Sequence, residues 1–224
     1  MKIKVIIPAG GEGLRLGGDV PKQFQLLGGQ PILKRTIAAF DGLDCIAEIA
    51  VAVPAGYISH VQSYGFDKVG HIIEGGESRA KSVYAALKCL GHDTSVVLIH
   101  DGARPFVSPE TIKAVADAAC AFGAAIACAP VTDTIKEVDS TGRISATPNR
   151  SKLWRAQTPQ GFTYDIITKA YAQGEKDDIL DAATDDSILV ERLGLPVYVV
   201  PAPAGNIKIT TPEDMLIGEV LLKG

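Results

Sequence analysis

Glycines, one arginine and one lysine lie close together in the stretch IIPAGGEGLRLGGDVPKQF, which runs from Ile6 to Phe24. A glycine-rich turn directly after a strand lets backbone N–H groups approach an anion and form a concave nest of donors. Arg15 and Lys22 add positive charge to that turn. The pattern predicts a loop that binds a polyphosphate. The alternative is an ordinary strand-to-helix turn with two solvated cations.

The two best-known phosphate loops do not fit this stretch. A Walker A loop needs GxxxxGK[ST], and the chain contains no such string. A dinucleotide-binding loop needs GxGxxG, but Leu16 stands where the third glycine is required. That motif also expects an acidic residue at the end of the second strand, where this chain reads VAVPAG. What remains is GGxGxR followed by PKQ, which suits a different polyphosphate ligand.

A second group of reactive side chains lies in HDGARPF, from His100 to Phe106, directly after the apolar run VVLI. Asp101 could orient a ribose hydroxyl or help to bind Mg²⁺, and Arg104 could bind a phosphate. The alternative is an Asp–Arg pair that braces the turn. His100 is interpreted as a residue at a strand end and not as a metal ligand.

Three further stretches leave their interpretation open. In GGESRAKS, Gly76 and Ser82 could approach a nucleotide base, although the stretch is equally typical of a helix N-cap. In NIKIT, Lys208 points either to solvent or into a cleft. Thr184 and Asp185 begin a helix in ATDDS, where simple capping is favoured.

Composition narrows the class of protein. The chain has 224 residues, a net charge of −4 and a pI near 5.6, which argues against a duplex nucleic-acid binder. Four cysteines without a CxxC pair predict buried, reduced thiols and no zinc site. The apolar run Val5–Ile7 stops at Pro8 and is far too short to span a membrane, so a cytoplasmic protein is expected.

The elements that must position these residues alternate between strand and helix patterns. Such alternation predicts an α/β fold with a mostly parallel sheet flanked by helices. The expected strands are 2–7, 46–53, 71–74, 95–100, 124–130 and 197–200, and the expected helices are 32–40, 58–64, 78–90, 109–122, 165–173, 185–193 and 212–222.

The alternation breaks in the segment from Val131 to Phe162. A turn signal at Asp139–Gly142 between two polar strands predicts a β-hairpin. The segment has too little apolar surface to build a core of its own. It is therefore either a loose excursion or an arm that packs on something else, such as a second copy of the chain.

Eight motifs together resemble the 2-C-methyl-D-erythritol 4-phosphate cytidylyltransferases, in the order in which that family carries them. They extend over nearly the whole chain: PAGGEGLRLG, PKQF, GGESRAKS, HDGARPF, DTIK, NRSKLWRAQTPQGF, ATDDS and NIKITTPEDM. The resemblance implies a Rossmann-like nucleotidyltransferase fold in one domain, 1–224, with 131–157 as a dimerisation arm exchanged between the subunits of a homodimer. It also implies the transfer of a cytidylyl group from CTP to 2-C-methyl-D-erythritol 4-phosphate, with release of pyrophosphate, in non-mevalonate isoprenoid biosynthesis. Mg²⁺ would be bound largely through the CTP phosphates, with no metal site made by the protein alone.

The same resemblance assigns roles to residues of this chain. Arg15 and Lys22 would hold the triphosphate, together with Gly11 and Gly13 of the glycine loop. Backbone around Ala9, Gly10 and Gly76, with Ser82, would read the cytosine. Asp101 would lie beside nucleotide and acceptor. The acceptor phosphate would meet Thr134, Arg150 and Arg104 from a partner's arm region. Thr158, Thr184 and Lys208 would complete the pocket. The catalytic residues would be Arg15, Lys22, Arg150 and Lys208.

Direct attack by the acceptor phosphate suits these residues, because the chain offers cations and a nest but no Ser–His or Cys–His nucleophile. Three other functions compete with this one. A ribitol 5-phosphate cytidylyltransferase shares most of the motifs, although NRSKLWRAQTPQGF fits the methylerythritol enzymes better. A sugar-1-phosphate nucleotidyltransferase fits the fold but not the hairpin arm. A nucleotide-binding regulator would bind CTP without releasing pyrophosphate.

Overall fold

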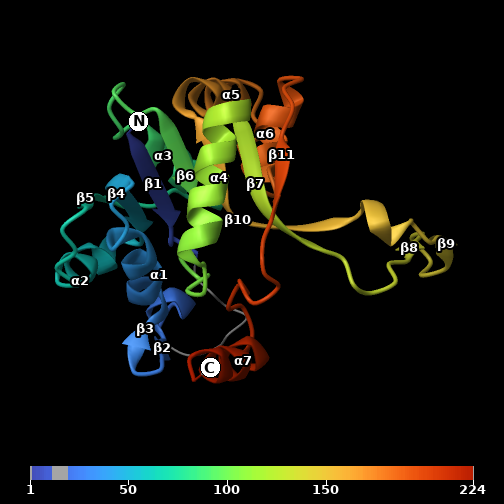
Figure 1. Cartoon of the computed structure of the whole chain (residues 1–224), viewed down its shortest axis with the longest axis horizontal. Helices are drawn as coiled ribbons and strands as arrows, with labels where there is room; N and C mark the ends of the chain where they lie inside the picture. The colour runs from blue at the N-terminus through green and yellow to red at the C-terminus, as the bar shows by residue number, and fades with distance from the viewer. Residues whose placement is uncertain (1, 12–19, 224) are drawn as a thin grey trace.

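A seven-stranded sheet forms the centre of the molecule, in a computed structural model that describes residues 2–11 and 20–223. Neighbouring strands are parallel, except that one strand, β10, is antiparallel to both of its neighbours. The α/β fold with a mostly parallel sheet is therefore confirmed (Figure 1). The strand order is β11 (Tyr198–Pro201), β7 (Ala124–Pro130), β10 (Trp154–Thr163), β6 (Val96–Ile99), β1 (Ile3–Pro8), β4 (Ile46–Val53) and β5 (Val69–Glu74).

Side chains that alternate along β1 supply apolar residues to both faces of the sheet. Val5 and Ile7 belong to one hydrophobic cluster and Ile6 to the other, and all three have 0% exposure. A strand buried on both faces needs an unbroken apolar run, which is why these short segments are legible in the sequence. Helices α1 (Ile32–Asp41), α2 (Ile58–Gln62) and α4 (Pro109–Phe122) cover the first face, and α3 (Arg79–Leu87), α5 (Tyr164–Lys176) and α6 (Ser187–Arg192) cover the second.

Local signals set the ends of α4 where the sequence predicts them. The Ser108 hydroxyl accepts a hydrogen bond from the Thr111 backbone N–H at 3.2 Å, and Pro109 begins the helix. Gly123 ends it with a φ of +90°, in the region that favours glycine. The remaining regular elements lie near the carboxyl edge of the sheet or at the end of the chain: β2 (Leu26–Leu27), β3 (Gln30–Pro31) and α7 (Pro212–Leu221).

The sequence predicts no strand of the central sheet in the segment 131–162, and this prediction is wrong for the end of the segment. From Gln157 to Phe162 the chain is buried in β10, at the centre of the sheet between β6 and β7. The pattern is hidden because Gln157, Thr158 and Gln160 are polar although they are at most 5% exposed. These side chains bond to other polar groups, so a strand in the middle of the sheet lacks the usual apolar signature.

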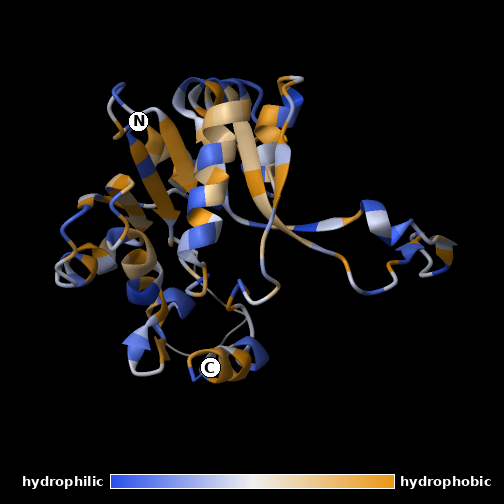
Figure 2. Cartoon of the chain, viewed as in Figure 1, coloured by the Kyte–Doolittle hydropathy of each residue, from blue (hydrophilic) through white to orange (hydrophobic). Residues whose placement is uncertain are grey.

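The arm, residues 131–157, projects away from the body as a long hairpin (Figure 1). Its strands β8 (Glu137–Val138) and β9 (Ile144–Ala146) pair antiparallel around the predicted turn, so the hairpin is confirmed. Its last four residues already belong to β10. Strands β6 and β7 are hydrophobic along most of their length, whereas the arm mixes polar and apolar residues (Figure 2). Val138 and Ile144 are 60% and 57% exposed.

All four cysteines are free thiols, as predicted, but their expected burial holds only for Cys128. Cys45 and Cys120 are exposed, and Cys89 is half-buried. Across residues 2–11 and 20–223, the helices are all too short or too polar to cross a membrane.

Candidate active site

Three loops that carry predicted site residues meet at the carboxyl edge of the sheet. Ala9 follows β1, Gly76 follows β5, and Asp101 follows β6. From β1 the chain first adds β4 and β5 on one side of β1, and it then returns to place β6 on the other side. In open α/β sheets, a crevice for ligands forms at the carboxyl ends of the strands where the order reverses in this way.

A first cleft at this edge brings eight of the predicted residues together. Its lining combines glycine-rich loops with charged side chains. The predicted residues that line it are Ala9, Gly10, Gly11, Lys22, Gly76, Ser82, Asp101 and Lys208. Gly13 and Arg15 lie outside the residues that the structure describes.

Small residues let the loops of the first cleft approach each other closely. A Cβ on Gly75 would lie 3.0 Å from the Ser82 Oγ and 3.4 Å from the Gly10 Cα. The Gly76 N–H donates to the Ser82 hydroxyl at 3.0 Å, and that hydroxyl donates to the Ser78 carbonyl at 2.9 Å. Ser82 thus fixes the position of the Gly76 backbone, while Ser78 acts as the N-cap of α3.

Gln23 anchors the backbone that follows β1. Its side-chain amide donates to the carbonyl oxygens of Ala9 at 2.5 Å and Gly11 at 3.2 Å. The next residue, Phe24, stacks on Tyr57 with ring centroids 4.0 Å apart. These contacts hold the short turn that places Lys22 at the first cleft.

Asp101 faces three cations although it is only 6% exposed. Its Oδ1 lies 2.9 Å from the Arg79 Nε, and its Oδ2 lies 2.9 Å from the Lys208 Nζ and 3.4 Å from the Arg104 Nε. Burial alone would raise the pKa of this carboxyl, but the charges of Arg79, Lys208 and Arg104 hold it well below its usual range. The suspected Asp101–Arg104 pair exists, but it is the longest of the three contacts.

A chain of hydrogen bonds behind Asp101 fixes its backbone. The Asp101 N–H donates to the Thr158 hydroxyl at 3.0 Å, and that hydroxyl lies 3.1 Å from the His100 Nδ1. The His100 Nε2 lies 3.0 Å from the Arg104 carbonyl, which can only accept, so Nε2 carries the proton and Nδ1 accepts from Thr158. Burial lowers the pKa of His100 to about 4, which keeps the ring neutral.

A second cleft lies on the other side of Asp101. It shares Arg79, Asp101 and Lys208 with the first cleft, so these three side chains form a common wall. Lys208 therefore points into a cleft, which answers the question that the sequence leaves open. The other predicted residues that line the second cleft are Arg104, Thr158 and Thr184.

Comparison with known proteins agrees with this arrangement. The family model of 2-C-methyl-D-erythritol 4-phosphate cytidylyltransferase (IspD) matches residues 3–224. The chain belongs to this family. It is similar to the family member of Alkaliphilus oremlandii, with 45% identity over 99% of this chain and 95% of that protein, and to that of Syntrophus aciditrophicus, with 44% identity over 99% and 96%.

Solved structures support the same membership of the cytidylyltransferase family. The chain resembles the 4-diphosphocytidyl-2C-methyl-D-erythritol synthase of Anaerococcus prevotii with a TM-score of 0.88 and 30% identity, covering 100% of this chain and 96% of that one. It also resembles the 2-C-methyl-D-erythritol 4-phosphate cytidylyltransferase of Thermus thermophilus, with a TM-score of 0.82, 34% identity and full coverage of both chains.

Two of the residues predicted for the cytidylyltransferase site lie apart from both clefts. Thr134 and Arg150 are exposed on the arm, and neither lines the first or the second cleft. Arg150 instead donates from its Nη1 to the Thr132 carbonyl at 2.8 Å. Within one chain, the structure therefore does not bring these two residues to the common wall.

Several polar residues of the site are missing from the sequence prediction. Arg79 has a signal that could have been used, because a cation in the first turn of α3 is unfavourable beside the positive end of the helix dipole unless it is paired. The N-cap residue of α6 is Asp186, whose side chain makes no cap hydrogen bond, while the Asp185 Oδ1 just before it accepts from the Ile188 N–H at 3.1 Å. The residues that carried no usable signal are Gln157, Gln160, Asp186 and Asn206, which lie buried in polar contacts.

Proposed function

We propose that the chain transfers the cytidylyl group of CTP to 2-C-methyl-D-erythritol 4-phosphate, which gives 4-diphosphocytidyl-2-C-methyl-D-erythritol and pyrophosphate. One observation carries the proposal beyond family membership. Two clefts share a wall of Arg79, Asp101 and Lys208, so two anionic substrates can meet where positive charge is concentrated.

The first cleft suits the nucleotide. Backbone of Ala9 and Gly76 lines it, and the carbonyl oxygens of both residues can accept from a cytosine amino group, while their N–H groups already donate to the Ala52 carbonyl and the Ser82 hydroxyl. Lys22 would contact the triphosphate, and the role of Arg15 in the same glycine loop remains a proposal from the sequence.

The second cleft suits the acceptor. Arg104 and Lys208 would bind its phosphate or hydroxyl oxygens, and Thr158 and Thr184 line the same space. In this proposal, the arm provides the remaining residues of the acceptor cleft. Its exposed Thr134 and Arg150 would enter the acceptor cleft of a second copy, which makes a homodimer with exchanged arms the working unit.

The proposed reaction needs no protein nucleophile. An oxygen of the acceptor phosphate bonds to the α-phosphorus of CTP, and the bond from that phosphorus to the bridging oxygen of the β-phosphate breaks, so pyrophosphate leaves with the electron pair. Holding the two phosphates in line supplies much of the acceleration. Lys22, Lys208 and Arg104 stabilise the charge that collects on the phosphate oxygens.

The donor set fits a magnesium ion that CTP itself brings. No group of three His, Cys, Asp or Glu side chains among residues 2–11 and 20–223 could hold a metal alone. Mg²⁺ is often bound by phosphates plus one or two carboxylates, and Asp101 is the carboxylate in the common wall. When bound, the ion would neutralise part of the phosphate charge.

The experiment that tests the function follows pyrophosphate. Purified protein is incubated with Mg²⁺ and CTP, and 2-C-methyl-D-erythritol 4-phosphate or ribitol 5-phosphate is added in parallel. Release with the first acceptor alone is expected. Release mainly with ribitol 5-phosphate would keep the mechanism but change the acceptor. Binding of CTP with no release would favour a nucleotide-binding regulator.

Two coarser expectations are retained as part of the proposal. A single domain of residues 1–224 with the arm as its dimerisation element agrees with a sheet that takes strands from both ends of the chain. A cytoplasmic location agrees with four free thiols, which suit a reducing compartment.

A further inference from the structure

We infer that Arg79, Asp186 and Tyr171 form a positioning chain that holds the Asp101 carboxylate in the common wall. The inference rests on the proposed function, because it assigns these residues to the same reaction. Asp186 and Tyr171 line neither cleft, so they act on the substrates through other side chains, and Arg79 joins Asp186 to the Asp101 carboxylate.

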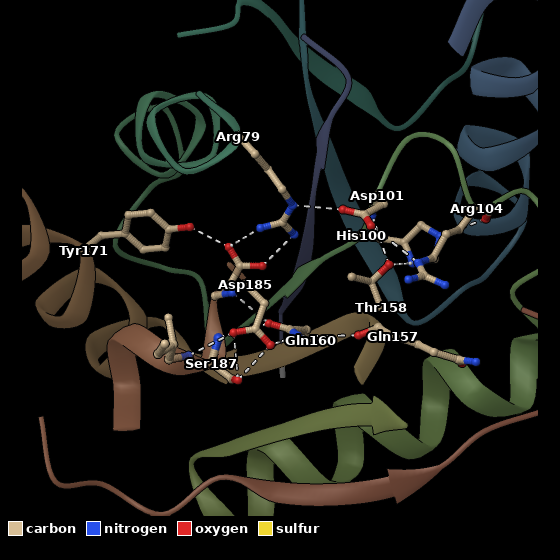
Figure 3. A network of polar contacts seen from close by, with 12 residues as sticks. Arg79, His100, Asp101, Arg104, Gln157, Thr158, Gln160, Tyr171, Asp185 and Ser187 are labelled. Atoms are coloured by element: carbon tan, nitrogen blue, oxygen red, sulfur yellow. Dashed lines mark hydrogen bonds and ion pairs between the residues drawn. The ribbon is translucent and has the colours of Figure 1, made fainter. Parts of the chain in front are cut away.

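Arg79 uses its whole guanidinium fork in protein contacts (Figure 3). Its Nη1 and Nη2 bind the two oxygens of Asp186 at 3.0 and 2.7 Å, and its Nε binds the Asp101 Oδ1 at 2.9 Å. A planar fork with fixed donors sets both the distance and the direction of its partners. Arg79 therefore transmits the position of Asp186 to Asp101.

Asp186 is buried with a full set of partners although no substrate can reach it. The side chain has 0% exposure, and the Tyr171 hydroxyl donates to its Oδ1 at 2.5 Å. Its backbone N–H and that of Ser187 both donate to the Gln160 Oε1 at 3.0 Å, which ties the start of α6 to the central strand β10. Tyr171 is itself fully buried and stacks on Tyr84.

A net gain in stability is a weak reason for such an arrangement, because replacement of a whole buried ion pair by well-packed apolar residues is often neutral or stabilising. The direction of the Arg79 Nε supplies a stronger reason, because it engages one oxygen of Asp101 and leaves the other facing Lys208 and Arg104. The two Asp101 oxygens therefore have different roles. Arg79 holds Oδ1 in place, and Oδ2 contacts Lys208 and Arg104, the cations that face the substrates.

The test compares variants that keep or remove the fork. Arg79→Lys keeps the positive charge, but an ammonium group cannot direct hydrogen bonds to as many partners at fixed angles as a guanidinium group can. Asp186→Asn replaces one carboxylate oxygen by an amide group, which is a hydrogen-bond donor and faces the donors of the guanidinium. For both we expect kcat to fall by about tenfold or more, since misplacement of a reacting group is costly. The KM for CTP should change by less than kcat, because the contacts of Gly76 and Lys22 remain.

Two phenylalanine variants separate positioning from core packing. Tyr171→Phe removes only the hydroxyl that reaches Asp186, and we expect a smaller but measurable fall in kcat. Tyr164→Phe is the matched control, because Tyr164 lies in the same hydrophobic cluster and its hydroxyl donates to the Leu90 carbonyl at 3.2 Å. The control should keep the kcat of the unaltered chain.

A second readout does not depend on activity. The Asp101 carboxyl carbon is followed by NMR as pH changes, after assignment by comparison with Asp101→Asn. We expect the pKa of Asp101 to rise in Arg79→Gln, which removes a facing cation, and to stay low in Arg79→Lys. A low pKa combined with a low kcat in Arg79→Lys would show that geometry matters beyond charge.

The outcomes are distinct. Folded Arg79→Lys and Asp186→Asn with kcat within twofold of the unaltered chain would overturn the inference, as would equal losses in Tyr171→Phe and Tyr164→Phe. If the unaltered chain released no pyrophosphate with either acceptor, the proposed function would fail. Whatever the activity, an Asp101 pKa that is the same in Arg79→Gln as in the unaltered chain would show that Arg79 does not hold Asp101.

Discussion

Asp101 and Arg150 are both charged side chains assigned to the same reaction, yet their surroundings differ in every respect. Asp101 is buried, contacts three cations and is backed by the hydrogen bonds of Thr158. Arg150 is exposed on the arm, and its Nη1 donates to the backbone carbonyl of Thr132 in the same arm.

The difference shows which half of the site one chain can complete. The common wall is preorganised, because burial and pairing fix its side chains before any ligand arrives. The arm holds its polar residues on a hairpin without a core, so a defined position for them has to come from another surface. Substitutions in the body and in the arm, with expected effects of decreasing size, can test this contrast.

The largest effect should follow the loss of a cation from the common wall. Lys208→Ala removes the Nζ that lies 2.9 Å from Asp101, and we expect turnover to fall by about 10²–10³, typical of a preorganised donor. Asp101 keeps Arg79 and Arg104, so the fold should persist. The pyrophosphate assay and a melting curve check this, with Lys113→Ala on the exposed side of α4 as control. Near-normal turnover in Lys208→Ala would exclude its assigned role.

The arm should give a different signature, because the proposed function places its residues in the site of the partner subunit. Lys22→Ala and Arg150→Ala are each expected to be nearly inactive. After mixing and subunit exchange, half of the dimers are mixed and each has one intact site, so about a quarter of normal activity should return.

Arg143→Ala is the matched arm control for this experiment. Arg143 lies near the hairpin turn, is 83% exposed and pairs with Asp139 of the same arm. It should leave activity unchanged. If exchange is proven by mass and no activity returns, each site is built from one chain and the proposed role of the arm is wrong.

The contrast also explains what the sequence could predict. Strands β1 and β6 are apolar on both faces, and Ser108 and Gly123 mark the ends of α4, so local chemistry specifies these elements. The loop residues after these strands were predictable too, because parallel strands bring their carboxyl ends to one edge.

Long-range pairing was not predictable in the same way. Arg79 and Asp186 are 107 positions apart, and no residue next to either of them in the sequence indicates that the two will pair. Gln157 and Gln160 look like surface residues in the sequence, because their burial depends on partners such as Asn206 and Asp185. Polar networks of this kind become visible only when the topology is known.

Within the body, the neutral state of His100 predicts an acid-sensitive fold. The folded pKa is about 4 and the ordinary value is 6.5, so the unfolded chain binds the extra proton between these two pH values. Stability should therefore fall as pH drops from about 6.5 to about 4, by about 3 kcal/mol from this residue.

Denaturant unfolding at several pH values measures this contribution. His100→Gln should show a flatter dependence across that range, even if its stability at neutral pH is lower. His92→Gln, at an exposed position, should keep the slope of the unaltered chain. Parallel slopes for both variants would contradict the assignment. Loss of ionised Asp101 belongs to more acidic conditions, because its pKa lies well below its usual range.

The smallest effect on folding is expected at the tip of the arm. Ile144 is 57% exposed in β9, so Ile144→Ser should change the free energy of unfolding of an isolated subunit by less than about 0.5 kcal/mol. Its effect should appear in the dimer instead, because an apolar side chain that another copy covers loses that contact. Sedimentation at decreasing concentration compares the dissociation of the variant with that of the unaltered chain.

The exposed Phe122 on α4 gives the matched control, since Phe122→Ser removes apolar surface from the body and should leave dimer dissociation unchanged. Weaker association in Phe122→Ser but not in Ile144→Ser would move the contact between subunits from the arm to the body.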